Sequence, residues 1–77
     1  MMRMAYFTQA FRIGVSVFVV LIYEVKGGIF KIIRRTEVVR KGREYRMNPP
    51  LSADEYNRPL NFLHKIKVAI RGLENGN

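Results

Sequence analysis

"FRIGVSVFVVLIYEV", from Phe11 to Val25, is the stretch that decides the fold of this 77-residue chain. No charged residue occurs between Ile13 and Tyr23, and most positions in that range hold Val, Ile, Leu or Phe. Such a run suits either a membrane-spanning helix or a strand buried on both faces. The choice between these two interpretations sets every later expectation about fold and function.

The membrane interpretation takes residues Met4–Val25 as one spanning helix. A span needs about 20 mainly apolar residues, which this range supplies. Tyr6 and Tyr23 would then lie near the two interfaces. Arg12 would cost roughly 2.5–3.5 kcal/mol inside the bilayer unless it snorkels or meets a partner. Twelve basic residues follow the run, from Lys26 to Arg71. This asymmetry places the basic tail on the cytoplasmic or matrix side.

The strand interpretation starts from the many β-branched residues in the same run. "VKGGIF", residues 25–30, has the Gly-Gly pair of a tight hairpin turn, with Ile29–Val39 as the return strand. Lys41 and Gly42 supply a further turn toward Tyr45. Against this interpretation, Phe18–Ile22 shows no alternation of apolar and polar residues, so both faces would need cover. One helix covers one face, and the other would invite association or aggregation.

The C-terminal third predicts an amphipathic helix in either case. "MNPPLSADE", residues 47–55, begins with prolines that favour extended backbone. Ser52 and Glu55 have the spacing of a capping box, which marks a helix start. Beyond Pro59, apolar residues recur on one face at helical spacing. They are Phe62, Ile66, Ala69, Ile70 and Leu73.

The asymmetry of charge favours the membrane interpretation, and the predicted fold is therefore mainly α. Residues 1–26 form an N-terminal membrane-spanning segment, 27–51 a basic juxtamembrane and extended linker, and 52–77 a C-terminal amphipathic helix and tail. The alternative is a soluble α+β fold made of a β-hairpin and the C-terminal helix.

Composition argues against an enzyme. There is no cysteine, and His64 is the only histidine, so disulfides and Cys-ligated zinc are excluded and a protein metal cage is not expected. Asp54 and Glu55 are adjacent and suit the helix start better than acid–base chemistry. The glycine pair lacks the pattern of a phosphate-binding loop. We therefore predict no catalytic, metal or cofactor-binding residue and no cofactor.

Charge predicts a polyanionic partner, because 14 Lys and Arg against six Asp and Glu give a net charge of +8. Under the membrane interpretation the basic segment binds anionic lipid headgroups. The residues predicted for lipid or polyanion contact are Lys31, Arg34, Arg35, Arg40, Lys41, Arg43 and Arg46. Those predicted to face larger membrane-complex subunits are Arg12, Phe62, Ile66 and Ile70. Under the alternative the same segment binds nucleic acid, with Phe30 and Tyr45 stacking on bases.

The predicted architecture resembles the small single-span accessory subunits of respiratory-chain complexes. "IRGLENGN", residues 70–77, is similar to the closing residues of one such subunit of NADH dehydrogenase. This resemblance implies a non-catalytic structural subunit that stabilises its neighbours, with the mitochondrial inner membrane as its location. The same residues also fit a small viral or phage membrane protein. The rival function is that of a soluble basic module that binds nucleic acid or associates with itself.

Overall fold

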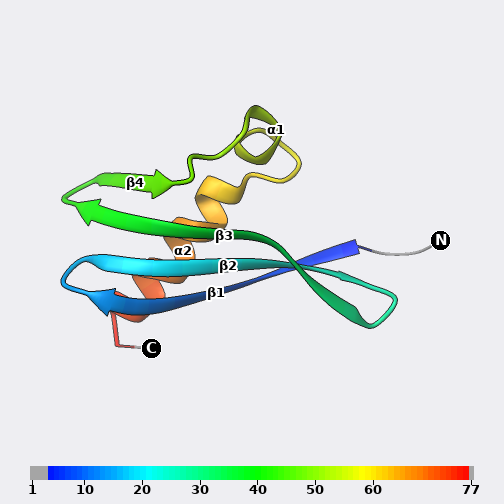
Figure 1. Cartoon of the computed structure of the whole chain (residues 1–77), viewed down its shortest axis with the longest axis horizontal. Coiled ribbons are helices and arrows are strands. Elements are labelled where there is room, and N and C mark those ends of the chain that lie inside the picture. The colour runs from blue at the N-terminus through cyan, green and yellow to red at the C-terminus, as the bar shows by residue number, and fades with distance from the viewer. Residues whose placement is uncertain (1–3, 77) are drawn as a thin grey trace.

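The structure, a computed structural model, describes residues 4–76 as a four-stranded antiparallel sheet followed by two helices (Figure 1). The strands lie in chain order, so each pairs with the next in sequence. The elements are β1 (Met4–Gly14), β2 (Val17–Lys26), β3 (Ile29–Lys41), β4 (Glu44–Asn48), α1 (Ala53–Tyr56) and α2 (Phe62–Glu74).

The stretch that decides the fold is a β-hairpin. β1 ends at Gly14, and the chain reverses at Val15 and Ser16 before β2 begins. Ser16 has a φ of 56°, the left-handed conformation that a tight reversal needs. Phe11 then lies opposite Val19 across the β1–β2 ladder, and Val19 lies opposite Glu37 on β3. Residues 13–23 are thus extended on both sides of a turn.

The predicted mainly α fold, with a spanning helix over residues 1–26, is therefore wrong. Within residues 4–76, no helix combines the length and the apolar character that crossing a bilayer requires. The predicted membrane location and the role of single-span accessory subunit depended on that helix and are wrong on the same ground. The physical reason is the turn at Val15 and Ser16, which divides the apolar run between two strands.

The alternative α+β prediction fits the structure better. Gly27 and Gly28 form the β2–β3 turn with φ angles of 57° and 77°, as their pairing in the sequence predicts. The segment 27–51 was expected to be a linker, but it contains β3 and β4. Gly42, with a φ of 57°, lies in the turn between them.

The core lies between one face of the sheet and α2. β2 contributes alternate residues, Phe18, Val20 and Ile22, each of which is fully buried. α2 contributes Phe62, Ile66 and Ile70, which have the spacing of one helical face and are at most 1% exposed. Val38 and Thr36 complete the buried set from β3. The predicted apolar stripe of the C-terminal helix is confirmed.

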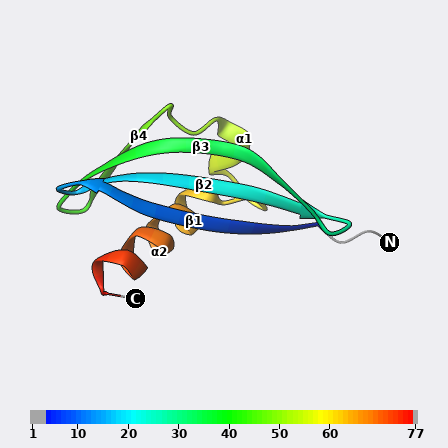
Figure 2. The same cartoon turned by 60° about the horizontal axis from the view of Figure 1, so that its bottom comes forward.

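The two layers leave one face of the sheet uncovered. Figure 2 shows the curved sheet on one side and α2 on the other, with no described element over the sheet's second face. The hairpin that joins β2 and β3 extends past the helix, so its outer end has cover on neither face (Figure 1). A single helix and a long sheet therefore leave much apolar strand surface in contact with solvent.

We expect Ile66→Ala to destabilise the fold by about 2–5 kcal/mol, because it removes fully buried methyl groups and leaves a cavity against β2. Val68→Ala is the matched control on the same helix, since Val68 is 51% exposed, and its effect should stay within about 0.5 kcal/mol. Urea unfolding followed by far-UV circular dichroism measures both. Equal destabilisation by the two variants would contradict this arrangement of α2.

Candidate functional site

The uncovered surface of the sheet, here called the open face, carries the alternate residues that point away from α2. On β2 these are Val17, Val19, Leu21, Tyr23 and Val25, which alternate with the buried residues of the core. Ladder partners share a face, so Phe7 and Phe11 of β1 join them opposite Tyr23 and Val19. On β3, Phe30 and Ile32 lie opposite Val25 and Tyr23. The open face is therefore largely apolar.

Three aromatic rings form a row across the open face. Phe7 and Tyr23 have ring centroids 6.1 Å apart, and Tyr23 and Phe30 have centroids 6.4 Å apart in an edge-to-face arrangement. The Tyr23 hydroxyl donates a hydrogen bond of 2.9 Å to the Gln9 side chain. These contacts hold Tyr23 in place, while Phe7 and Phe30 remain 49% and 62% exposed. Phe11, 48% exposed, lies further along β1.

Arg35 lies beside this aromatic row, and further cations lie on the same face toward the β3–β4 end of the sheet. Arg35 lies opposite Leu21, and Arg46 lies opposite Val39, so both belong to the open face. Lys41 and Arg43 are exposed at the β3–β4 turn. Glu37 is the one carboxylate among the open-face residues of β1, β2 and β3. The face thus combines exposed rings with a local excess of positive charge.

The alternation on β3 changes phase at a bulge. Ile32 pairs with Tyr23 and Arg34 pairs with Ile22, which leaves Ile33 as an extra residue without a ladder partner. Past this bulge the even-numbered residues Arg34 and Thr36 point toward the helix layer, and Arg35 points to the open face. Alternation places the two adjacent arginines on opposite faces, and the bulge decides that Arg34 takes the helix side and Arg35 the open face.

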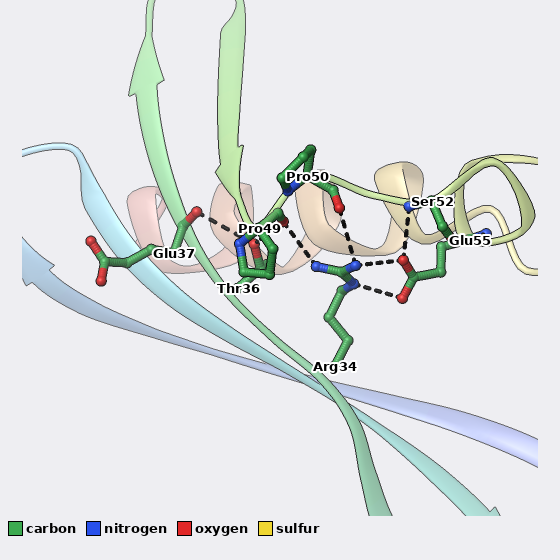
Figure 3. A network of polar contacts seen from close by, with 7 residues as sticks. All are labelled: Arg34, Thr36, Glu37, Pro49, Pro50, Ser52 and Glu55. Atoms are coloured by element: carbon green, nitrogen blue, oxygen red, sulfur yellow. Dashed lines mark hydrogen bonds and ion pairs between the residues drawn. The ribbon is translucent and has the colours of Figure 1, made fainter.

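Arg34 binds within the chain and is not free for a partner (Figure 3). Its Nε donates to Glu55 at 2.7 Å, and Nη2 donates to the other oxygen of that carboxylate at 2.5 Å. Nη1 and Nη2 also donate to the carbonyl groups of Pro49 and Pro50. Thr36 donates to the Pro49 carbonyl at 3.1 Å. This network fastens the β4–α1 connection to β3.

The predicted capping box at the start of α1 is confirmed and belongs to the same network. The Glu55 backbone N–H donates to the Ser52 hydroxyl, and the Ser52 N–H donates to the Glu55 carboxylate at 2.9 Å. The hydrogen bonds from Arg34, with help from Ser52, lower the pKa of Glu55 from its usual 4.5 to about 2. Glu55 thus remains ionised over the whole physiological range.

Arg40 is a second cation with partners in its own chain. Its Nη1 donates to Glu74 of α2 at 2.8 Å, and its Nε donates to the Tyr45 hydroxyl at 3.3 Å. The hydrogen bond to Tyr45 and the charge of Glu74 raise the pKa of Arg40 above its usual value. The centre of the Tyr45 ring is also 5.3 Å from the Lys67 ammonium, and Tyr45 is partly buried against the core. It is therefore not placed with Phe30 for stacking.

The predicted polyanion-contact residues are thus divided by the fold. Arg34 and Arg40 tie the two layers together, while the other five are exposed, namely Lys31, Arg35, Lys41, Arg43 and Arg46. The residues predicted to face a partner have different surroundings. Phe62, Ile66 and Ile70 fill the chain's own core, and the Arg12 guanidinium lies 5.2 Å from the centre of the Phe18 ring.

Sequence reasoning missed Phe7, Phe11 and Tyr23 as members of one surface. Their period-2 spacing on β1, as Phe7, Gln9 and Phe11, was the available signal. This signal was hidden because Tyr6 and Ala10, which lie on the other face of β1, are apolar as well.

Two shallow depressions flank α2. One of 390 Å³ is lined mainly by Tyr45, Met47, Leu51, Tyr56 and Leu63, and one of 270 Å³ lies between β1 and α2. Among residues 4–76, no group of three or more His, Cys, Asp or Glu side chains gathers into a metal site.

Comparisons with protein-family models, with curated proteins and with solved structures found no match to this chain. They leave the resemblance to respiratory-chain accessory subunits untested. The open face is therefore the feature from which a function is inferred.

We expect the stability of the fold to decrease as the pH falls from about 4.5 toward 2, because protonation of Glu55 breaks its ion pair with Arg34. A group whose pKa is lowered in the folded state stabilises that state above its ordinary pKa and loses the effect below it. Glu55→Gln should cost about 2 kcal/mol at pH 7 and flatten this dependence. Urea unfolding at several pH values measures both effects.

Glu44→Gln is the control for that experiment, since Glu44 is an exposed carboxylate beside the β3–β4 turn. It should leave the acid dependence as it is in the wild type. If Glu55→Gln also retained the full acid dependence, the Arg34–Glu55 pair would not be its source.

Proposed function

We propose that this chain is a non-catalytic module that binds single-stranded nucleic acid on its open face. The observation that carries the proposal is the row of rings Phe7, Tyr23 and Phe30 with the exposed Arg35 beside it, on the same face as the exposed Arg46. Proteins that hold single strands combine aromatic stacking platforms with a positively charged groove. Both components lie here on one sheet.

Charge supports a polyanion as the partner. The chain has a net charge of +8, and two of its six carboxylates, Glu55 and Glu74, are occupied by Arg34 and Arg40. The exposed cations therefore meet few acidic neighbours. Phosphates bound by them release counterions, which makes such binding strongly salt-dependent.

The exposed rings favour a single strand over a duplex. Bases in a duplex are stacked on one another and present only their edges, whereas a single strand offers the flat faces of its bases. Phe7 and Phe30 expose about half of their surface or more in a region that α2 leaves uncovered. Each base stacked on such a ring contributes about 1–3 kcal/mol.

Phe30→Ala should weaken binding of a labelled oligothymidine of about 15 nucleotides by roughly 5- to 150-fold, because one stacking platform is lost. Tyr56→Ala is the control, since Tyr56 is 56% exposed but lies on α1, away from the open face. Fluorescence anisotropy at about 50 mM salt measures the affinity. Equal losses in the two variants, or a duplex bound as tightly as the single strand, would refute the proposal.

Charge neutralisation at neighbouring positions tests the phosphate contacts separately. Arg35→Gln should lower the slope of log K against log salt by about 1, and Glu37→Gln should strengthen binding, because each changes one charge on the open face. Arg58→Gln is the control for a distant exposed cation and should leave the affinity almost unchanged. If Arg35→Gln and Glu37→Gln left the affinity unchanged while Arg58→Gln lowered it, the interface would lie elsewhere.

A further inference from the structure

The free edge of β1 differs from the free edge of β4. β4 has five residues, Glu44–Asn48, carries Glu44 and Arg46, and is followed by Pro49 and Pro50. Short length, charge and proline are the usual means by which proteins protect a sheet edge. β1 has 11 residues and carries no charge from Met4 to Phe11. Within the described chain, its outer side has no strand neighbour.

The helix layer ends beside this unprotected edge. The backbone of α2 runs closest to β1 (Figure 2). The Tyr6 ring meets the Phe62 ring edge-to-face, with the ring centroids 5.5 Å apart. The 270 Å³ depression along the edge is lined by Tyr6, Thr8, His64, Lys65, Val68 and Ala69. Val68 is 51% exposed there. The edge of β1 therefore offers both unpaired backbone groups and an adjoining apolar surface.

We infer that two copies of this chain pair through their β1 strands, antiparallel and with Thr8 on the two-fold axis. In such a pairing, residues directly opposite each other have numbers that add up to 16 and point to the same face. Tyr6 then meets Ala10 of the second copy, and Ala5 meets Phe11. In these two pairs a large side chain faces a small one, and Phe7 meets Gln9 of the second copy. Thr8 meets Thr8, a favourable cross-strand pair.

Charge is compatible with a second copy as the occupant. No charge on β1 from Met4 to Phe11 opposes another across this ladder. Arg12, the charged residue of β1, lies opposite Met4 of the second copy in this register. Lys65 lines the depression beside the edge, but its ammonium donates to the Leu60 carbonyl and lies 5.6 Å from the centre of the Tyr6 ring. It is therefore directed onto its own chain rather than across the edge.

The area needed for a stable dimer requires α2 as well as β1. A standard interface removes about 800 Å² from each partner, roughly a seventh of the 5708 Å² that this chain exposes. One strand edge alone supplies less than this. The exposed Val68 and the partly buried Ala69 beside the edge extend the contact into the helix layer. The result is one continuous sheet of two copies with its open faces on the same side.

The absence of cysteine from the sequence makes the register directly testable. Single variants Phe7→Cys, Thr8→Cys, Gln9→Cys and Asn48→Cys are oxidised without nucleic acid present. Residues opposite each other have Cα atoms about 4.5–5.5 Å apart, within disulfide range, whereas diagonal neighbours are about 7–8 Å apart. Thr8→Cys should crosslink at least about tenfold faster than the other three. Fastest crosslinking at any other position would overturn the inference.

Sedimentation equilibrium measures the association itself. The wild type should have twice the 9.0 kDa chain mass at micromolar concentration. Thr8→Lys places two ammonium groups opposite each other on the axis, and it should raise the dissociation constant of the dimer at least about tenfold. Thr8→Val and Asn48→Lys should not. A monomeric wild type, or equal weakening by Asn48→Lys, would overturn the inference. Neither result would bear on nucleic-acid binding, since the anisotropy assay measures that separately.

Discussion

The packing of α2 against β2 is the contact on which the rest of the structure depends. β2 is apolar on both faces, and α2 has one apolar stripe, with Phe62, Ile66 and Ile70 buried against it. A helix covers one face of a sheet, so the second face of β2 has no protein layer within residues 4–76. The open face is thus a direct result of having one helix for a strand that is apolar on both sides.

An uncovered apolar surface matters for the stability of a chain of this size. A domain of about 60 to 80 residues buries only about 60% of its unfolded surface and is marginally stable. Ion pairs across the layers therefore matter: Arg34 fastens the β4–α1 connection to β3, and Arg40 joins β3 to Glu74 of α2. Arg34 and Arg40, which were predicted to contact a polyanion, stabilise the fold instead. The cations left for a partner include Arg35 and Arg46, which strand alternation directs to the open face.

Local signals made part of the fold predictable. The Ser52–Glu55 capping box, the Gly27–Gly28 turn and the stripe on α2 each depend on residues within a few positions of one another. β1 was not predictable in this way, because Tyr6 and Ala10 on one face are as apolar as Phe7 and Phe11 on the other. The positive φ at the first turn also belongs to Ser16, whereas a glycine usually marks such a reversal.

The distribution of the basic residues between the two faces could not be predicted from the sequence, for a different reason. Strand alternation alone assigns Arg34 and Arg35 to opposite faces but does not say which face each one takes. The bulge at Ile33 decides this, because one extra residue reverses the phase of everything that follows on β3. No sequence pattern in residues 29–41 predicts the bulge. The candidate site therefore depends on a feature visible only once the strands are paired.

The face and the edge of the sheet call for different partners on physical grounds. The open face presents side chains while the backbone groups of its central strands are occupied by the ladder, so it suits a partner with flat rings and charge. The outer edge of β1 presents unpaired N–H and C=O groups, which only another peptide strand satisfies at the right spacing. A nucleic acid cannot complete that ladder, and a β-strand gains little from the aromatic row. The two proposals thus occupy separate surfaces, and pairing at β1 would enlarge the open face without covering it.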